Sequence, residues 1–117
     1  MKAVLPQILS ARECGEERVL SLYIDPELQF FMGHFPGYPL LPGVVQLDWA
    51  IRCAVDAFGP LGDFRGLEKL KFQALIRPGE HLNLRLSFDP KSGRLLFSYE
   101  GVNDRKSSGT ITFSPKS

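Results

Sequence analysis

The stretch GHFPGYPLLPGVVQLD, residues 33–48, decides how this chain folds. Its first part, residues 33–43, holds three glycines and three prolines, a density that predicts an ordered loop rather than a helix or strand. Residues 43–58 contain no proline and are followed by Gly59-Pro60, which predicts a helix with a defined end. Pro42 suits the first turn of that helix, because its missing N–H costs nothing there.

The expected helix is apolar around most of its circumference, which is typical of a buried helix. Apart from Gln46, its polar residues are Asp48, Arg52 and Asp56. These three recur every four residues and therefore form one narrow stripe.

The second half of the chain changes to a period of two. Apolar and polar residues alternate over 69–76, 81–88, 94–99 and 110–113, and residues 19–24 form a further short apolar run. One apolar face per strand is the pattern of an antiparallel sheet that covers something on one side. We therefore expect an α+β fold, with one domain over residues 1–117 in which an antiparallel sheet wraps around a single buried helix.

Length and composition exclude several classes of protein. The 117 residues fit one domain, and 14 Lys+Arg against 13 Asp+Glu leave a net charge of +1, which argues against broad nucleic-acid binding. The two histidines and two cysteines are too far apart in the sequence to predict a zinc site or a disulfide framework. We see no targeting segment and no apolar run long enough to span a bilayer, so the expected compartment is the cytoplasm.

Three residues of the 33–48 stretch carry potential chemistry. His34 can accept or donate a proton near neutral pH, and the prolines around it restrict its backbone. Gly43 lies where helix N–H groups lack partners, and a glycine allows a ligand to approach such a donor closely. Asp48 is costly to bury on an apolar helix unless it is paired or used.

This stretch resembles the active-site signature of the FabA/FabZ-type 3-hydroxyacyl-acyl-carrier-protein dehydratases, which have the hotdog fold. The variant PLLPGVVQLDWA, residues 39–50, is most similar to the short ApeI-type dehydratases that are associated with aryl polyene clusters. Residues 67–80 resemble the second half of the same family, so the resemblance covers roughly residues 16–114.

The resemblance implies a role for each residue. His34 would remove the C2 proton of a 3-hydroxyacyl thioester, the Gly43 N–H would stabilise the thioester oxygen, and Asp48 would help the C3 hydroxyl to leave as water. Arg52 departs from the family, which often has glutamine there, and it could form an ion pair with Asp48 that weakens Asp48 as a proton donor.

The resemblance also implies partners. The substrate would be carried on the phosphopantetheine arm of an acyl carrier protein, with no cofactor bound to this chain and no metal. Because the histidine and the acid that face each other come from different subunits in this family, a homodimer is expected, and a heterodimer with another hotdog subunit is possible.

For several other residues the sequence allows either a functional or a purely structural interpretation. An acyl tunnel could be lined by Phe31, Phe35, Leu40, Leu41 and Trp49, although each one is equally explained as ordinary core. An acidic carrier protein could meet Arg65, Lys69, Lys71 and Arg77, which otherwise form solvated faces. We expect His81 on the surface and Cys53 in the core.

Two other functions remain open from the sequence. Hotdog thioesterases also use a carboxylate on the central helix, although GHFPG is not their signature. A non-catalytic subunit of a heterodimeric dehydratase could retain the motif, and Arg52 keeps that alternative open.

Overall fold

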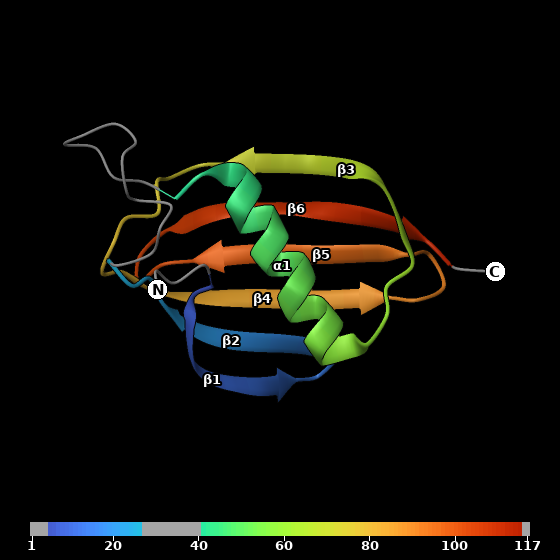
Figure 1. The fold of residues 1–117 in the computed structure, drawn as a ribbon, viewed down its shortest axis with the longest axis horizontal. Coiled ribbons are helices and arrows are strands. Elements are labelled where there is room, and N and C mark those ends of the chain that lie inside the picture. The colour runs from blue at the N-terminus through green and yellow to red at the C-terminus, as the bar shows by residue number, and fades with distance from the viewer. Residues whose placement is uncertain (1–4, 27–40, 116–117) are drawn as a thin grey trace.

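A computed structural model describes residues 5–26 and 41–115 and shows one six-stranded sheet with one helix across its face (Figure 1). The elements in chain order are β1 (Gln7–Cys14), β2 (Glu17–Tyr23), α1 (Gly43–Phe58), β3 (Asp63–Phe72), β4 (His81–Asp89), β5 (Arg94–Glu100) and β6 (Arg105–Ser114). Within the described ranges, no helix is long and apolar enough to cross a membrane.

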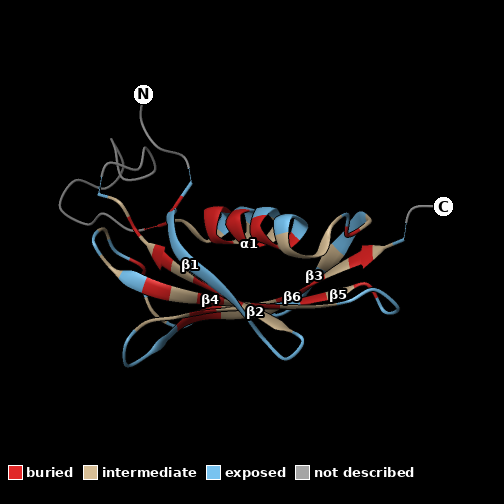
Figure 2. Cartoon of the chain, turned by 90° about the horizontal axis from the view of Figure 1, so that it is seen from below, coloured by how far each residue is buried: buried red, intermediate tan, exposed pale blue. Residues whose placement is uncertain are grey.

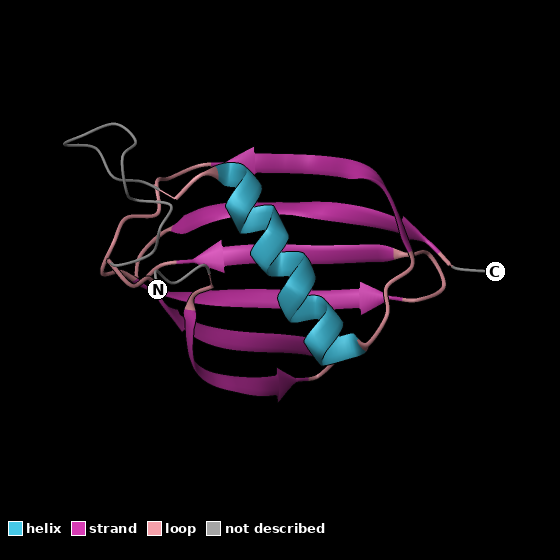
Figure 3. Cartoon of the chain, viewed as in Figure 1, coloured by secondary structure: helices cyan, strands magenta, loops and turns pink. Residues whose placement is uncertain are grey.

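The strand order is β1-β2-β4-β5-β6-β3, and every neighbouring pair is antiparallel. The chain leaves β2 near one edge, passes through α1 and returns as β3 at the opposite edge. The helix therefore runs diagonally over the sheet, as Figure 3 shows. Seen from below in Figure 2, the sheet curves toward the helix at both sides, so that the helix lies on its concave face.

The core fills the space between the helix and the sheet. Every second residue is buried over 82–86 on β4 and over 95–99 on β5, as the period of two predicts, and Phe88 on β4 is partly buried. The helix contributes Trp49, Ala50, Cys53 and Ala54 to the same cluster. Each fully buried leucine or isoleucine contributes about 2 kcal/mol relative to an exposed one, so this layer accounts for much of the folding free energy.

The expected helix is confirmed from Gly43 to Phe58, and strands β2, β4 and β5 agree with the expected ranges within a few residues. Gly59 ends the helix with φ 84°, and its N–H donates to the carbonyl of Val55 at 2.8 Å. Pro42 lies one position earlier than expected, at the N-cap rather than in the first turn.

The expectation for residues 69–76 was wrong in its bounds, because β3 spans Asp63–Phe72. Within the strand, the register against β6 shifts twice, the second time between Glu68 and Lys71, where Lys69 adopts a φ of 52°. These shifts break the simple alternation that the sequence pattern assumes. Strand β6 is also longer than expected, and β1 was not predicted at all.

The expectation that the helix is buried all round is wrong for the single chain. Only one face of α1 meets the sheet, while Val44 is 73% and Val55 43% exposed on its other side. One sheet can cover only one side of a helix, so the apolar residues of the outer face remain open.

Candidate functional site

The structure describes only part of the predicted site. Gly43, Asp48, Leu41 and Trp49 lie in the described ranges. The expected histidine, His34, and three expected tunnel residues, Phe31, Phe35 and Leu40, lie outside them. The helix and its surroundings are therefore the part of the site whose geometry is visible.

Gly43 is the first residue of α1, as predicted. The Pro42 carbonyl accepts hydrogen bonds from the N–H groups of Val45 at 3.1 Å and Gln46 at 3.2 Å, which closes the first turn. The first N–H groups of a helix have no acceptor within the helix, and they lie at the positive end of its dipole. The backbone at Gly43 therefore offers a donor suited to an oxygen that gains negative charge.

The ring of Phe72, at the end of β3, lies against Gly43. A Cβ built on Gly43 would be 2.7 Å from Cζ of Phe72, closer than a real side chain tolerates. The Phe72 ring is itself half exposed. A side chain at position 43 would therefore force the Phe72 ring to shift, and this exposed aromatic side chain borders the helix start.

Asp48 lies on the outer side of the helix and is paired. The Arg52 Nε donates to the Asp48 Oδ2 at 2.8 Å, and the two side chains are 63% and 54% exposed respectively. The ion pair that the sequence suggested is confirmed. An exposed pair one turn apart contributes only about 0.3–0.5 kcal/mol to stability, so the fold does not depend on these two residues.

Trp49 and Leu41 are fully buried in the core cluster between the helix and the sheet. A role for either one in lining an acyl tunnel stays a prediction. Leu41 is also held by its backbone, because its N–H donates to the carbonyl of Ile76 at 2.9 Å.

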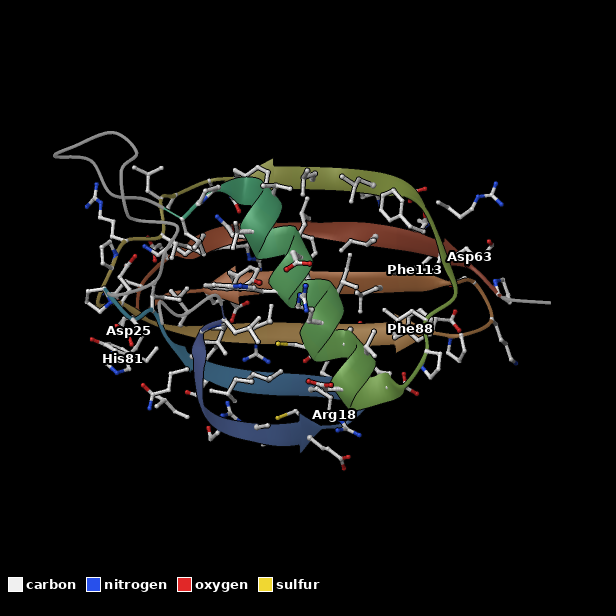
Figure 4. The ribbon with its side chains drawn as sticks, in the orientation of Figure 1. Arg18, Asp25, Asp63, His81, Phe88 and Phe113 are labelled. Carbon is white, nitrogen blue, oxygen red and sulfur yellow. The ribbon has the colours of Figure 1, made fainter. Side chains whose placement is uncertain are left out.

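A groove of about 440 Å³ lies at the other half of the helix, between β1, β2 and the last turns of α1. Arg18 lines this groove, and Figure 4 shows it near the end of α1. Its guanidinium pairs with Glu13 at 2.7 Å and lies 5.7 Å from the centre of the Phe58 ring. Cys53 lines the floor, where burial, and then the nearby Asp56, raises the pKa of its thiol to about 11. Cys53 is a core residue, as expected.

Two other titratable side chains of the described residues, His81 and Lys106, lie outside this groove. His81 is exposed and contacts the Tyr23 ring, with the ring centres 5.1 Å apart, which confirms it as a surface residue; Figure 4 shows it at the end of the sheet where β4 begins. Lys106 is buried between Glu80 at 3.0 Å and Asp104 at 3.1 Å. Burial lowers the pKa of Lys106, but the hydrogen bonds to these carboxylates outweigh it and the net shift is upward. In the described part of the chain, no three His, Cys, Asp or Glu side chains are grouped as metal ligands.

Two residues near Gly43 were missed by the sequence reasoning. Phe72 was expected only as one apolar residue of a strand, and its contact with Gly43 joins segments distant in sequence. Gln46 was set aside as a polar exception, yet it is buried. A signal for Gln46 existed, since it is the polar residue on the helix stripe that also carries Trp49, Ala50 and Cys53.

Comparison with known proteins gives one consistent result. Residues 10–110 match the family model described as ApeI dehydratase, of the ApeI-like family. The structure resembles that of the dehydratase heterocomplex ApeI:P from Xenorhabdus doucetiae, with a TM-score of 0.84 and 37% identity, covering 92% of this chain and 96% of that one. The dehydratase domain from the CurF module of curacin polyketide synthase shares the fold, with a TM-score of 0.69, at 14% identity over 97% of this chain and 45% of that one.

Among curated proteins, the chain is similar to the 3-hydroxyacyl-[acyl-carrier-protein] dehydratase FabZ of Ruminiclostridium cellulolyticum. The two are 31% identical over 106 residues, which cover 85% of this chain and 70% of the relative. FabZ of Caldanaerobacter subterraneus is 40% identical over 67 residues, 51% of this chain and 48% of that protein. The chain spans about half the length of several of the curated relatives it matches.

Proposed function

Because this chain belongs to the ApeI-like dehydratase family, we propose that it removes water from a 3-hydroxyacyl thioester to give the trans-2-enoyl thioester. The acyl chain would be carried on the phosphopantetheine arm of an acyl carrier protein, in fatty-acid or aryl polyene synthesis. The observation that carries the proposal is the family match over residues 10–110. The matched range includes α1, which begins with Gly43 and exposes Asp48 on its outer face.

The proposed reaction breaks the C2–H and C3–O bonds and forms the C2–C3 double bond. His34 takes the C2 proton, and the electron pair left on C2 is delocalised onto the thioester oxygen. The Gly43 N–H donates a hydrogen bond to that oxygen as its negative charge grows. The pair then forms the double bond as the C3 hydroxyl leaves with a proton, so that one water is released.

Asp48 is proposed to hold the C3 hydroxyl. Its Oδ2 accepts a hydrogen bond from Arg52, and such an ion-paired carboxylate acts well as an acceptor. The proton that completes the water can then be the one that His34 took from C2. In this form the reaction balances without a separate acid, and Arg52 fixes the Asp48 carboxylate rather than reacting itself.

We also propose that two subunits share the site. β3 is an edge strand whose exposed side chains include Phe64, Leu67 and Phe72, and Leu75 follows it. The same side of the molecule exposes Val44 at the start of α1, next to Gly43. Exposed apolar residues on an edge strand favour association. The two register shifts limit regular strand pairing, so side-chain contacts are expected to carry much of this interface.

The second subunit is proposed to be another copy or a different hotdog chain. A similar solved structure comes from a heterocomplex, ApeI:P, which favours a heterodimer as a specific alternative. In that case the chain alone would show little activity, and activity would appear on mixing with the second subunit. The exposed Arg65, Lys69 and Lys71 of β3 are available to an acidic carrier protein, although they are equally explained as solvated residues.

The test is dehydration of a defined 3-hydroxyacyl carrier protein by the purified chain, followed by mass spectrometry of the acyl group. Loss of the mass of one water from the acyl chain with the thioester intact supports the proposal, and His34→Ala should abolish it. Release of the free thiol without an enoyl product would instead identify a thioesterase. If neither product forms with the chain alone or with a second hotdog subunit, the proposal is wrong.

A further inference from the structure

Gln46 occupies an unusual position for an amide side chain. It lies in the first turn of α1 on the face that packs against the sheet, and it is 3% exposed. Burying an amide costs free energy unless its donors and acceptor are satisfied. Both ends of this one are satisfied, because Ser107 Oγ donates to Gln46 Oε1 at 2.6 Å and Gln46 Nε2 donates to the Leu41 carbonyl at 3.2 Å.

The two bonds link the start of the helix to the sheet. Tyr99 on β5 and Ser107 on β6 are paired across the two strands, and both are fully buried under the helix. The Tyr99 hydroxyl donates to the backbone carbonyl of Gln46 at 2.6 Å, while Ser107 holds the side-chain oxygen. Gln46 is thus held by two neighbouring strands through two different groups.

Gln46 in turn holds the two peptide groups that precede Gly43. Its side chain donates to the Leu41 carbonyl at 3.2 Å. The Pro42 carbonyl accepts from the main-chain N–H groups of Val45 and Gln46, two bonds that do not depend on the side chain at position 46, so the side chain acts through the Leu41 peptide group. The Pro42 carbonyl and the Gly43 N–H belong to one planar peptide group, so fixing the carbonyl also fixes the direction of the N–H. Proline allows little change in φ, and the Leu41 bond therefore fixes the angle at which the chain enters the helix.

From this arrangement we propose that Gln46, held by Ser107 and Tyr99, is a positioning residue that sets the direction of the Gly43 N–H and the entry of the preceding segment into α1. The inference rests on the proposed function only for its effect on rate. Its structural part, the clamp on the helix start, holds whatever the reaction is. A donor that is misplaced by a fraction of an ångström stabilises a developing charge less well.

The first test compares kinetics per folded protein. Gln46→Met keeps the length of the side chain and removes both hydrogen bonds, and Ser107→Ala removes the donor to it. We expect kcat to fall about tenfold in each, with KM changed less than about twofold, because the interaction acts on the transition state. Ser21→Ala is the matched control, since it removes a serine hydrogen bond to Asn83 on β4, outside this network, and should leave kcat unchanged.

A rescue variant distinguishes positioning from a loss of packing. Gln46→Glu has nearly the same shape, but only its protonated form can donate to the Leu41 carbonyl while accepting from Ser107. Its activity relative to wild type should therefore rise as the pH is lowered, whereas the ratio for Gln46→Met should stay flat. If Gln46→Met and Ser107→Ala keep the wild-type kcat per folded protein, the inference is overturned.

Amide hydrogen exchange tests the clamp without any activity. In Gln46→Met the amides of Leu41 and Val45 should exchange about tenfold faster relative to amides of β4 and β5, and in Ser21→Ala they should not. Should wild type prove inactive in every dehydration assay, the proposed function fails and this exchange ratio alone decides the inference. An unchanged ratio would overturn it.

Discussion

The ring of Phe72 fills the space in which a side chain on Gly43 would lie, with its Cζ atom 2.7 Å from the position of such a Cβ. The contact joins the end of β3 to the first residue of α1, which are 29 positions apart in the sequence (72 minus 43). The Gly43 N–H, which is the proposed hydrogen-bond donor to the thioester oxygen, and the exposed edge of the sheet are therefore parts of one surface.

Gly43→Ala tests that contact. Replacing glycine by alanine in a helix normally stabilises by up to about 1 kcal/mol, so a lower melting temperature would show that the contact with Phe72 dominates. We expect the melting temperature to fall by a few degrees and kcat/KM to fall at least tenfold. In the background of Phe72→Ala, the same change should no longer lower the melting temperature. A Gly43→Ala chain with wild-type stability and activity would contradict the packing and the proposed role together.

The roles of Asp48 and Arg52 can be distinguished by replacing each charged side chain with an uncharged amide. Asp48→Asn should lower kcat at least a hundredfold, because the amide cannot serve as the anionic acceptor, while the melting temperature changes by no more than about 2 °C. Arg52→Gln should lower kcat by a smaller factor, about tenfold, because it frees the carboxylate without removing it. Steady-state kinetics and thermal melts on the same samples are the measurement. Equal losses from both substitutions would instead place Arg52 in the chemistry.

The exposed edge of β3 predicts how the chain associates. Leu67→Lys places a charge in the proposed interface and should shift the mass measured by light scattering toward the single chain, with a parallel loss of activity. Leu96→Lys is the matched control, because Leu96 is 49% exposed against 42% for Leu67 but lies on β5 in the middle of the sheet. If the two variants behave alike, the β3 edge is not the interface.

Cys53 predicts a loss of stability at alkaline pH. Burial raises its pKa from 9.0 to about 11, so the folded state favours the neutral thiol. The contribution of the buried neutral thiol to the free energy of unfolding is complete below pH 9. It is lost as the pH rises from 9 to about 11, because only the unfolded chain releases the thiol proton in that interval. A shift of this size corresponds to about 3 kcal/mol.

The measurement is the free energy of unfolding from urea titrations at pH values spaced from below 9 to about 11. The wild type should lose more stability over this range than Cys53→Ala, which removes the thiol, and the difference isolates Cys53 from other alkaline titrations such as that of Tyr99. A thiol reagent at mildly alkaline pH should modify the exposed Cys14 much faster than the buried Cys53. Parallel slopes for the two proteins would contradict the buried-thiol assignment.

Local signals predicted the helix and the inner strands well. Proline and glycine at both ends of residues 43–58 limited the helix, and the period of two located β4 and β5, because these strands bury one face against a single core. The edge strands were the failures. All eight residues of β1 are exposed, so no burial pattern marks it, and the register shifts of β3 displaced its alternation.

By itself, the sequence of this protein determined the helix, the class of fold, the family and the identity of the residues proposed for catalysis, since these depend on local chain stiffness, on periodicity and on a motif of fixed spacing. Only the tertiary structure decided that the helix has an open outer face, that Phe72 borders Gly43, and that Gln46 joins the helix start to Tyr99 and Ser107. These contacts link residues that lie 29 to 61 positions apart in the sequence. They arise because the sheet brings its last strands beneath the helix, which no local pattern encodes.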